Sequence, residues 1–296
     1  MKNQQTMKRG ALCAAPVGLA GSAGRMLAGA VALLLVSGAF GGRAWAIIGG
    51  EPDGNHHPNV GAVIFYDSAV GGVTCASGTL IHPRVLLTAG HVIDMIESGR
   101  VVLLGVSFEQ EISPEDSRTW LEVSEIVGTF TGATASPRDI DIGAIILRRP
   151  VRKLTPEPLP AEGFLESLKN AGQLLAGAEG TRFTVVGYGM RVDWPPPEPS
   201  WWADECPQRN AAESGYLGLN VGWLFLNQNL AAGYGGTTTG DSGGPTFWTD
   251  PETGEEVLVS VSSWGDINCI AHGLAYRIDT AESLGFIQDV IDSLEQ

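Results

Sequence analysis

The sequence Gly-Asp-Ser-Gly-Gly-Pro at residues 240–245 decides how the rest of this chain is interpreted. A serine that acts as a nucleophile needs an exposed hydroxyl on a tight turn, with hydrogen-bond donors nearby for an oxyanion. The glycines on both sides of Ser242 allow the backbone and a second molecule to approach closely. Taken alone, the same stretch would be an ordinary glycine turn of a β protein, so its meaning depends on other residues.

Two upstream stretches place a histidine and an aspartate beside apolar strands. Residues 85–91, Val-Leu-Leu-Thr-Ala-Gly-His, form an apolar run that ends in small residues and His91. A general base that titrates near neutrality is suitably held at the end of such a strand. Residues 139–147, Asp-Ile-Asp-Ile-Gly-Ala-Ile-Ile-Leu, place Asp141 at the start of a second apolar strand. Burying a carboxylate there is costly unless a partner awaits it, and a histidine N–H is such a partner.

The three stretches, with His91, Asp141 and Ser242 in that order, resemble the motifs of the chymotrypsin/trypsin family of serine proteases. The likeness runs from Ile47 to the C-terminal end and is that of a secreted, bacterial-type member. It implies an all-β fold of two six-stranded antiparallel β-barrels with a C-terminal α-helix. It also implies endopeptidase activity, the hydrolysis of peptide bonds through an acyl-enzyme intermediate. The alternative is a non-catalytic binding protein on the same fold.

The resemblance also assigns roles to single residues. Ser242 would attack the scissile carbonyl, and His91 would take its proton and later give it to the leaving amine. Asp141 would orient the imidazole, and it fits the family pattern better than Asp139 because isoleucine, a small residue and further apolar residues follow it. The backbone N–H groups of Gly240 and Ser242 would form the oxyanion hole.

Residues 1–46 have the parts of a secretory signal peptide. They contain no Asp or Glu, several basic residues, an apolar run over residues 27–40 and the exit sequence Ala-Trp-Ala at residues 44–46. An apolar run of 14 residues falls short of the roughly 20 that cross a bilayer. We therefore expect export to the extracellular space or the periplasm, rather than an uncleaved membrane anchor.

A new N-terminus is expected directly after this segment. Residues 47–50, Ile-Ile-Gly-Gly, resemble the sequence at which the family is activated. In that family the new ammonium group inserts and pairs with the aspartate before the nucleophile. The resemblance therefore implies an activation pair of Ile47 and Asp241, with export itself maturing the protein.

Composition limits the partners of the mature chain. Removal of residues 1–46 takes away five basic residues and moves the formal net charge from −15 to −20. Nucleic acid and anionic lipid would repel so acidic a protein. We expect a protein or peptide substrate, no membrane association after signal removal, no cofactor, no metal site and a monomer. The proline-containing segment 154–160 is interpreted as the crossing between an N-terminal barrel, residues 47–160, and a C-terminal barrel, residues 161–296.

Short apolar runs separated by turn residues predict the strands of an antiparallel barrel. Apolar residues at three- and four-residue spacing predict a helix near the C-terminus, and Asp193–Trp202 reads as an exposed loop. The predicted strands are 60–66, 84–88, 101–104, 122–127, 142–147, 183–187, 257–263 and 274–278, and the helix carries Leu284, Ile287, Val290, Ile291 and Leu294.

Further residues resemble the family's substrate-binding strand and pocket. Ser263-Trp264-Gly265 matches that strand, Gly236 stands where trypsin-like members have an aspartate, and Thr237 follows it. Gly265 and Gly273 match the two glycines of the pocket wall that leave room for a large side chain. An open, uncharged pocket favours an apolar or aromatic residue before the cleaved bond (P1), and a basic preference through Asp266 stays open.

The cysteines and two adjacent histidines depart from the family pattern or stand outside it. Three cysteines remain in the mature chain, which allows at most one internal disulfide. Thr238 occupies a position where the family usually has a paired cysteine, so Cys269 lacks that partner, and a Cys206–Cys269 bond is a possible replacement. His56 and His57 are expected in a solvated loop.

Overall fold

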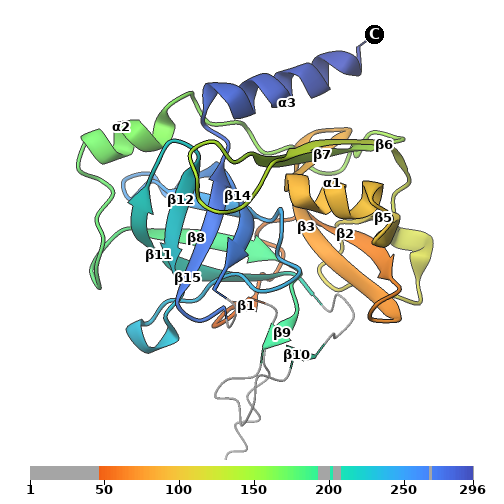
Figure 1. Ribbon diagram of the computed structural model, residues 1–296, viewed down its shortest axis with the longest axis horizontal. Helices are drawn as coiled ribbons and strands as arrows, with labels where there is room; N and C mark the ends of the chain where they lie inside the picture. Colours follow the sequence, from red (N-terminus) through yellow and green to blue (C-terminus); the bar gives the residue numbers. More distant parts are fainter. Residues whose placement is uncertain (1–46, 193–200, 203–207, 267–268, 296) are drawn as a thin grey trace, which may run out of the picture. The chain divides into compact units, whose positions relative to one another are not determined.

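The computed structural model describes residues 47–192, 201–202, 208–266 and 269–295 (Figure 1). The proposed signal segment, residues 1–46, lies outside this part of the chain. The described residues belong to one compact unit that spans Arg43–Gln296. Within it, the two large antiparallel sheets pair strands that are consecutive in sequence with others that are far apart in sequence, and the consecutive pairs follow from the short apolar runs and turns.

The first sheet has six strands in the order β5-β2-β3-β4-β7-β6. It curls on itself, and an isolated antiparallel bridge between Val106 and Leu121 joins the end of β5 to the segment before β6. Its interior is filled by β-branched and aliphatic side chains, which suit a buried pleated surface. The strands are β2 (Val60–Asp67), β3 (Gly72–His82), β4 (Val85–Thr88), β5 (Val101–Ser107), β6 (Val123–Phe130) and β7 (Asp141–Leu147).

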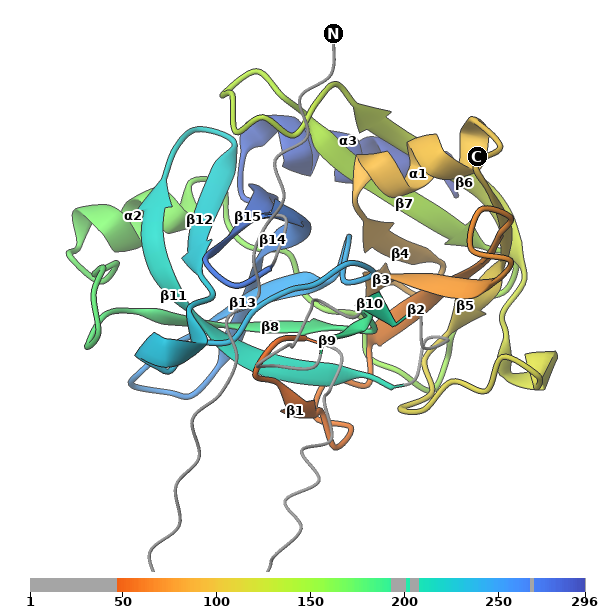
Figure 2. The same ribbon diagram turned by 60° about the horizontal axis from the view of Figure 1, so that its bottom comes forward.

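The second sheet has seven strands in the order β1-β11-β12-β15-β14-β13-β8, and an additional β11–β8 pairing closes it into a barrel (Figure 2). A separate two-stranded ribbon pairs β9 with β10. The strands are β1 (Glu51–Pro52), β8 (Arg182–Gly187), β9 (Arg191–Val192), β10 (Trp201–Trp202), β11 (Asn210–Leu219), β12 (Trp223–Asn227), β13 (Pro245–Thr249), β14 (Glu256–Gly265) and β15 (His272–Arg277).

In the described part of the chain, three α-helices and two short 3₁₀ turns accompany the sheets. The predicted C-terminal helix is α3, whose first turn is capped by the Thr280 hydroxyl accepting from Ser283 N–H, and Ile287 and Val290 are its buried apolar residues. None of the helices in the described ranges is long and apolar enough to cross a bilayer. The helices are α1 (Gly90–Glu97), α2 (Phe164–Asn170), α3 (Ala281–Ser293), η1 (Ser117–Thr119) and η2 (Leu230–Ala232).

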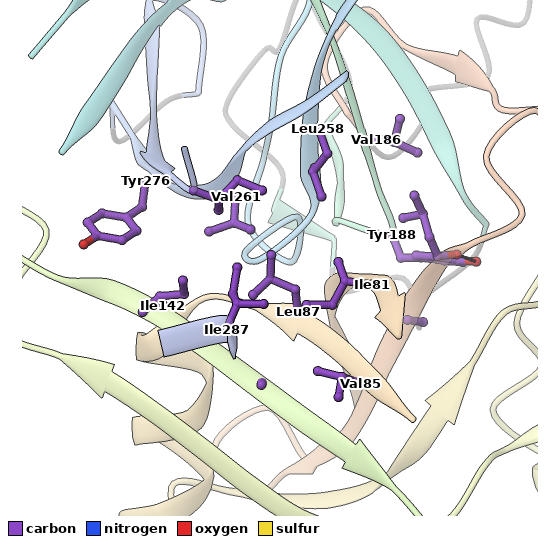
Figure 3. Packing of buried hydrophobic residues seen from close by; sticks show 14 of the residues in the cluster. Ile81, Val85, Leu87, Ile142, Val186, Tyr188, Leu258, Val261, Tyr276 and Ile287 are labelled. Carbon is purple, nitrogen blue, oxygen red and sulfur yellow. Dashed lines mark hydrogen bonds between the residues drawn. The ribbon is translucent and has the colours of Figure 1, made fainter. Parts of the chain in front are cut away.

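Buried apolar side chains from both sheets and from α3 form one cluster, part of which is drawn in Figure 3. The cluster includes Leu87 and Ile142 from the first sheet, Leu258 and Tyr276 from the second, and Ile287 from α3. This shared packing holds the end of β4 and the start of β7 against the second barrel. The segment that follows β4 and the first residue of β7, Asp141, are therefore held next to the second sheet.

The segment after Ile47 is tied to the second sheet. Ile48 forms a two-way backbone bridge with Gly236, with N···O distances of 2.8 and 2.9 Å. β1 then pairs with the start of β11. Ile47 itself is fully buried, and its φ of 60° is unusual for a β-branched residue inside a chain.

A buried ionic network lies next to this segment. Asp53 binds Arg209 Nε at 2.9 Å and His57 Nδ1 at 2.5 Å, and His57 Nε2 lies 2.9 Å from Glu256 Oε2. The expectation of a solvated loop at His56 and His57 is wrong for His57, which is buried because two carboxylates hold its ring. Burial alone would lower the pKa of His57, but the hydrogen bonds to Asp53 and Glu256 outweigh it and raise that pKa to about 9.

The predicted fold, two antiparallel β-barrels with a C-terminal helix, is confirmed. The second barrel is closed by strand pairing, while the first is closed only by the bridge described above. Residues 155–160 are irregular and lie between β7 and α2. The division of the chain into two barrels at residue 160 stays a prediction. Of the expected loop, residues 193–200 lie outside the described part, and Trp201–Trp202 form the short strand β10 instead.

Candidate active site

Asp141, the first residue of β7, accepts hydrogen bonds from three directions. Its side chain is fully buried, and its Oδ1 accepts from the backbone N–H of His91 at 2.8 Å. Its Oδ2 lies 2.9 Å from His91 Nδ1 and also accepts the hydroxyl of Ser263 on β14. Because the carboxylate can only accept, Nδ1 must carry the ring proton, and His91 Nε2 is left as the proton acceptor.

His91 stands near the start of α1, directly after β4. The strand is held in place by its buried Thr88, whose hydroxyl donates to the carbonyl of Ser77 at 2.8 Å. The His91 side chain is 20% exposed, and its ring meets Phe130 edge-on with centroids 5.9 Å apart. The imidazole is therefore fixed on one side by Asp141 and on another by an aromatic ring, while part of it reaches solvent.

The turn that carries Ser242 packs against the segment leading to His91. Gly243 has φ +80°, and a Cβ built on it would lie 2.0 Å from Thr88 Oγ1 and 2.7 Å from the backbone nitrogen of Ala89. Only glycine allows this approach. Between the described residues Ser242 and His91 no hydrogen bond is formed, so the pair is adjacent in the fold without being joined. Catalytic hydrogen bonds often tighten only when substrate binds.

The backbone before Ser242 presents unused donors. Gly240 adopts φ +96°, and its carbonyl accepts the hydroxyl of Ser77 at 3.2 Å. Within the described ranges, the N–H groups of Gly240 and Ser242 donate to no protein acceptor. Two such N–H groups on one turn are free to donate hydrogen bonds to an oxygen on which negative charge develops. The oxyanion-hole role of Gly240 and Ser242 stays a prediction.

Asp241 is turned into the protein. It accepts the backbone N–H of Gly189 at 2.7 Å and that of Thr238 at 2.8 Å. Burial raises the pKa of Asp241 to about 7 in spite of these hydrogen bonds. The predicted partner Ile47 is likewise buried, but no hydrogen bond joins Ile47 to Asp241 in this continuous chain, where Ile47 is an ordinary amide.

Asp139, the other acid considered for the triad, binds within its own loop, and among the described residues His91 is bound by Asp141 instead. Its Oδ2 accepts both the backbone N–H and the hydroxyl of Thr134, at 2.7 and 2.6 Å. These hydrogen bonds hold the pKa of Asp139 below its usual value. The carboxylate of Asp139 is thus used to hold the loop that connects β6 to β7.

A pocket of about 390 Å³ opens beside Ser242. It contains four of the predicted substrate-binding residues, Thr237, Ser263, Trp264 and Gly265, but not Gly236 or Gly273. The full lining is Thr237, Thr238, Thr239, Ser242, Ser262, Ser263, Trp264, Gly265, Asp266 and Cys269.

Part of the room that the pocket glycines were expected to leave for a large side chain is taken by Gln228, a residue that the sequence did not single out. Its side chain is fully buried and lies where the pocket glycines leave space. A Cβ built on Gly236 would lie 2.3 Å from Gln228 Cδ, and one built on Gly273 would lie 2.3 Å from Gln228 Oε1. The space freed by the two glycines is occupied by this chain's own amide.

Cys269 is a free cysteine and is buried, so the possible Cys206–Cys269 disulfide is not formed. Cys206 itself lies outside the described residues. Burial raises the pKa of the Cys269 thiol to about 11, so the thiol is neutral at ordinary pH. Its φ of 54° and its place in the pocket lining show that it shapes the pocket wall.

Comparison with known proteins agrees with the fold. A family model described as Trypsin matches residues 47–283. Among solved structures, the chain is similar in fold to the scabies mite inactivated protease paralogue S-I1, with 19% sequence identity and a TM-score of 0.56. That match covers 82% of this chain and 99% of the mite protein. From the family match over most of its length, the chain belongs to the trypsin family.

Proposed function

We propose that this chain is a serine endopeptidase in which Ser242, His91 and Asp141 form the catalytic triad. The observation that carries the proposal is the buried Asp141 carboxylate, which binds His91 through both the ring Nδ1 and the backbone N–H. A buried carboxylate that fixes the tautomer of a partly exposed histidine is what general-base catalysis requires. The adjacent glycine turn supplies the nucleophile.

In the proposed reaction, Ser242 Oγ attacks the carbonyl carbon of the scissile peptide bond while His91 Nε2 takes the hydroxyl proton. The tetrahedral intermediate collapses, and His91 gives that proton to the leaving amine, which departs and leaves an acyl-enzyme. Water then attacks the ester, passes a proton to His91, and Ser242 regains it as the acid product leaves. Asp141 stays ionised throughout and stabilises the imidazolium.

The negative oxygen of the intermediate would lie between the N–H groups of Gly240 and Ser242. Both groups donate to no protein acceptor within the described ranges, which supports this role. Loss of one such donor typically lowers the rate roughly 100- to 1000-fold. The substrate chain would run along Ser263-Trp264-Gly265, with its P1 side chain in the pocket next to Ser242.

Secretion and maturation are part of the proposal. Residues 1–46 would be removed on export. The mature protease would be a monomer of residues 47–296, with an N-terminal barrel of residues 47–160 and a C-terminal barrel of residues 161–296. The φ of 60° at Ile47 supports this, because an N-terminal residue has no preceding carbonyl and the steric restriction on φ disappears. A freed ammonium at Ile47 would also offer a partner to the buried carboxylate of Asp241.

The test is labelling of the processed protein, beginning at Ile47, with a fluorophosphonate probe. We expect the probe to label the protein and the label to vanish in Ser242→Ala, with the variant unfolding at the same temperature as the parent. Ser260→Ala, which removes a buried hydroxyl of β14 instead, should label normally. A folded, processed protein that takes no label would favour the alternative, a non-catalytic binding protein.

A further inference from the structure

We infer that Gln228 forms the floor of the pocket beside Ser242 and restricts cleavage to bonds that follow small, uncharged side chains. The inference rests on the proposed peptidase function and names its substrate class. It depends on the position of one glutamine side chain between Gly236 and Gly273, which otherwise would leave the pocket deep.

Gln228 is placed by the end of strand β12. Its backbone N–H donates to the carbonyl of Ala271 at 3.1 Å, which holds the residue beside the loop that leads into β15. The side chain then runs beneath the pocket. In addition to the close approaches to Gly236 and Gly273, a Cβ built on Gly265 would lie 3.7 Å from Gln228 Nε2. The amide therefore lies against Gly236 and Gly273, which come from separate segments, and leaves room for a Cβ at Gly265.

The Gln228 amide is fixed by a full set of hydrogen bonds. Its Nε2 donates to the carbonyls of Thr237 at 3.2 Å and Cys269 at 3.3 Å. Its Oε1 accepts the backbone N–H of Thr237 at 3.0 Å and the Thr237 hydroxyl at 3.1 Å. A primary amide has two donors and two lone pairs on oxygen, and all four are used here. Moving the side chain away would leave these buried groups unpaired.

This floor determines which side chains fit. Gln228 lies behind the lining residues Thr237 and Cys269, to whose carbonyls it donates, and does not itself line the open part of the pocket. We therefore expect an alanine- or valine-sized P1 group to lie between the Thr237–Thr239 segment and the Ser262–Gly265 strand without reaching it. We expect a phenylalanine or tyrosine ring to require the space between Gly236 and Gly273 as well, which the amide fills. The saturated amide also offers no hydrogen bond to a charged P1 group, and burying an unpaired charge is costly.

Asp266 does not restore a basic preference. It lines the pocket, but its carboxylate accepts backbone N–H groups of its own loop, from Ile270, Ala271 and His272, at 3.3, 2.8 and 3.0 Å. The Asp266 carboxylate is thus engaged by N–H groups of the loop that forms the pocket rim. We therefore expect the pocket to select on size and to disfavour lysine and arginine.

The experiment compares processed protein of four sequences on matched peptides that differ only at P1. For the parent, kcat/KM should be at least about tenfold higher for P1 alanine than for P1 phenylalanine, as differences of a few methylenes allow. Gln228→Ala should raise the phenylalanine-to-alanine ratio of kcat/KM by about tenfold or more. Gln228→Met, which keeps the side-chain volume and loses the amide, should keep the small-residue preference. Gln288→Ala, at an exposed glutamine of α3, is the control for substitution itself.

Two results would overturn the inference. One is a parent enzyme that cleaves after phenylalanine, lysine or arginine as well as after alanine. The other is a folded Gln228→Ala variant with an unchanged ratio. If that variant fails to fold, Gln228→Asn, which shortens the side chain by one methylene, should raise cleavage after leucine relative to alanine, and an unchanged ratio there also overturns the inference. Fluorophosphonate labelling is independent of P1, so it separates failure of this inference from failure of the proposed function.

Discussion

Gly189 donates its backbone N–H to Oδ1 of Asp241 over 2.7 Å, which ties the segment after β8 to the turn that carries Ser242. The preceding residue, Tyr188, accepts a hydrogen bond from Arg209 Nη1 at 2.9 Å, and Arg209 in turn binds Asp53. A buried chain of contacts thus runs from the segment after Ile47 to the candidate oxyanion turn. The first two predictions concern this chain.

Replacing Arg209 by alanine should lower the free energy of unfolding by about 3–5 kcal/mol, because it removes the fully buried one of the two cationic partners of the Asp53 carboxylate and leaves His57 as the other. Both side chains of this pair are fully buried. Urea unfolding followed by circular dichroism measures the change. Arg148→Ala removes an exposed ion pair with Glu122 and should change stability by less than about 1 kcal/mol. Equal losses of unfolding free energy in the two variants would contradict the prediction that the buried ion pair contributes more than the exposed one.

The stability of the protein should depend on pH through His57. Since the folded pKa is raised from 6.5 to about 9, the folded state holds the proton more tightly than the unfolded chain does. This contribution is fully present below pH 6.5 and is lost as pH rises through about 9. We expect it to be on the order of 3 kcal/mol. Besides Asp53 and Glu256, the half-buried Glu157 lies near enough to add to the field.

The measurement is the thermal unfolding temperature between pH 6 and pH 10. His57→Gln should flatten the profile in the window from 6.5 to 9, whereas His56→Gln, at the exposed neighbour, should leave it as in the parent. A parent profile that is flat across this window, or that rises with pH, would show that His57 is not held by the two carboxylates.

Locally clustered apolar residues predicted eight of the strands, although β12, whose apolar residues also cluster, was not among them. The long strand β3 was missed because Thr74, Ser77, Gly78 and Thr79 interrupt its apolar pattern, although pairing with β2 and β4 buries most of it. Helix α1 was missed because its eight residues are too few for a clear periodicity. In both cases contacts from distant strands decide the structure.

The same division holds for the candidate site. His91, Asp141 and Ser242 could be chosen because each stands in its own local motif. Gln228 could not, since nothing in the residues around it indicates that its side chain will lie between two distant glycines. The sequence identified those glycines but could not show what fills the space beside them.

The N-terminus of the active protein should be Ile47, as N-terminal sequencing of the secreted form will show. A chain that keeps one extra residue, Ala46, should have about 100-fold lower kcat/KM or less activity still, because it cannot form a buried ion pair with Asp241 worth roughly 3–5 kcal/mol. Equal activity of the two chains would exclude the activation pair.

The longer chain should also show a different pH dependence. Its Asp241 pKa is raised from 3.8 to about 7, so its folded state binds more protons than the unfolded state in that range. Its stability should therefore fall as pH rises from 4 to 7. In the chain that begins at Ile47, the ammonium should keep Asp241 ionised and remove most of that fall.

Ser263→Ala should lower kcat by about tenfold with little change in KM, because it removes one hydrogen bond to the Asp141 carboxylate that orients His91. Peptide hydrolysis under saturating and limiting substrate measures both constants. Ser260→Ala is the matched control, since that buried hydroxyl has no hydrogen-bond partner in the described structure. A Ser263→Ala enzyme with full kcat would show that the hydrogen bond from Ser263 is not needed to position Asp141.

Preparing this protein in quantity depends on the backbone at Ile47. A fusion partner attached before that residue would keep its nitrogen acylated and its φ at a value that isoleucine tolerates poorly. The bridge from Ile48 to Gly236 fixes the next residue, so the segment cannot slide to accommodate an added tag. An affinity tag after α3 avoids this conflict, and a cleavable leader that ends at residue 46 would leave no scar.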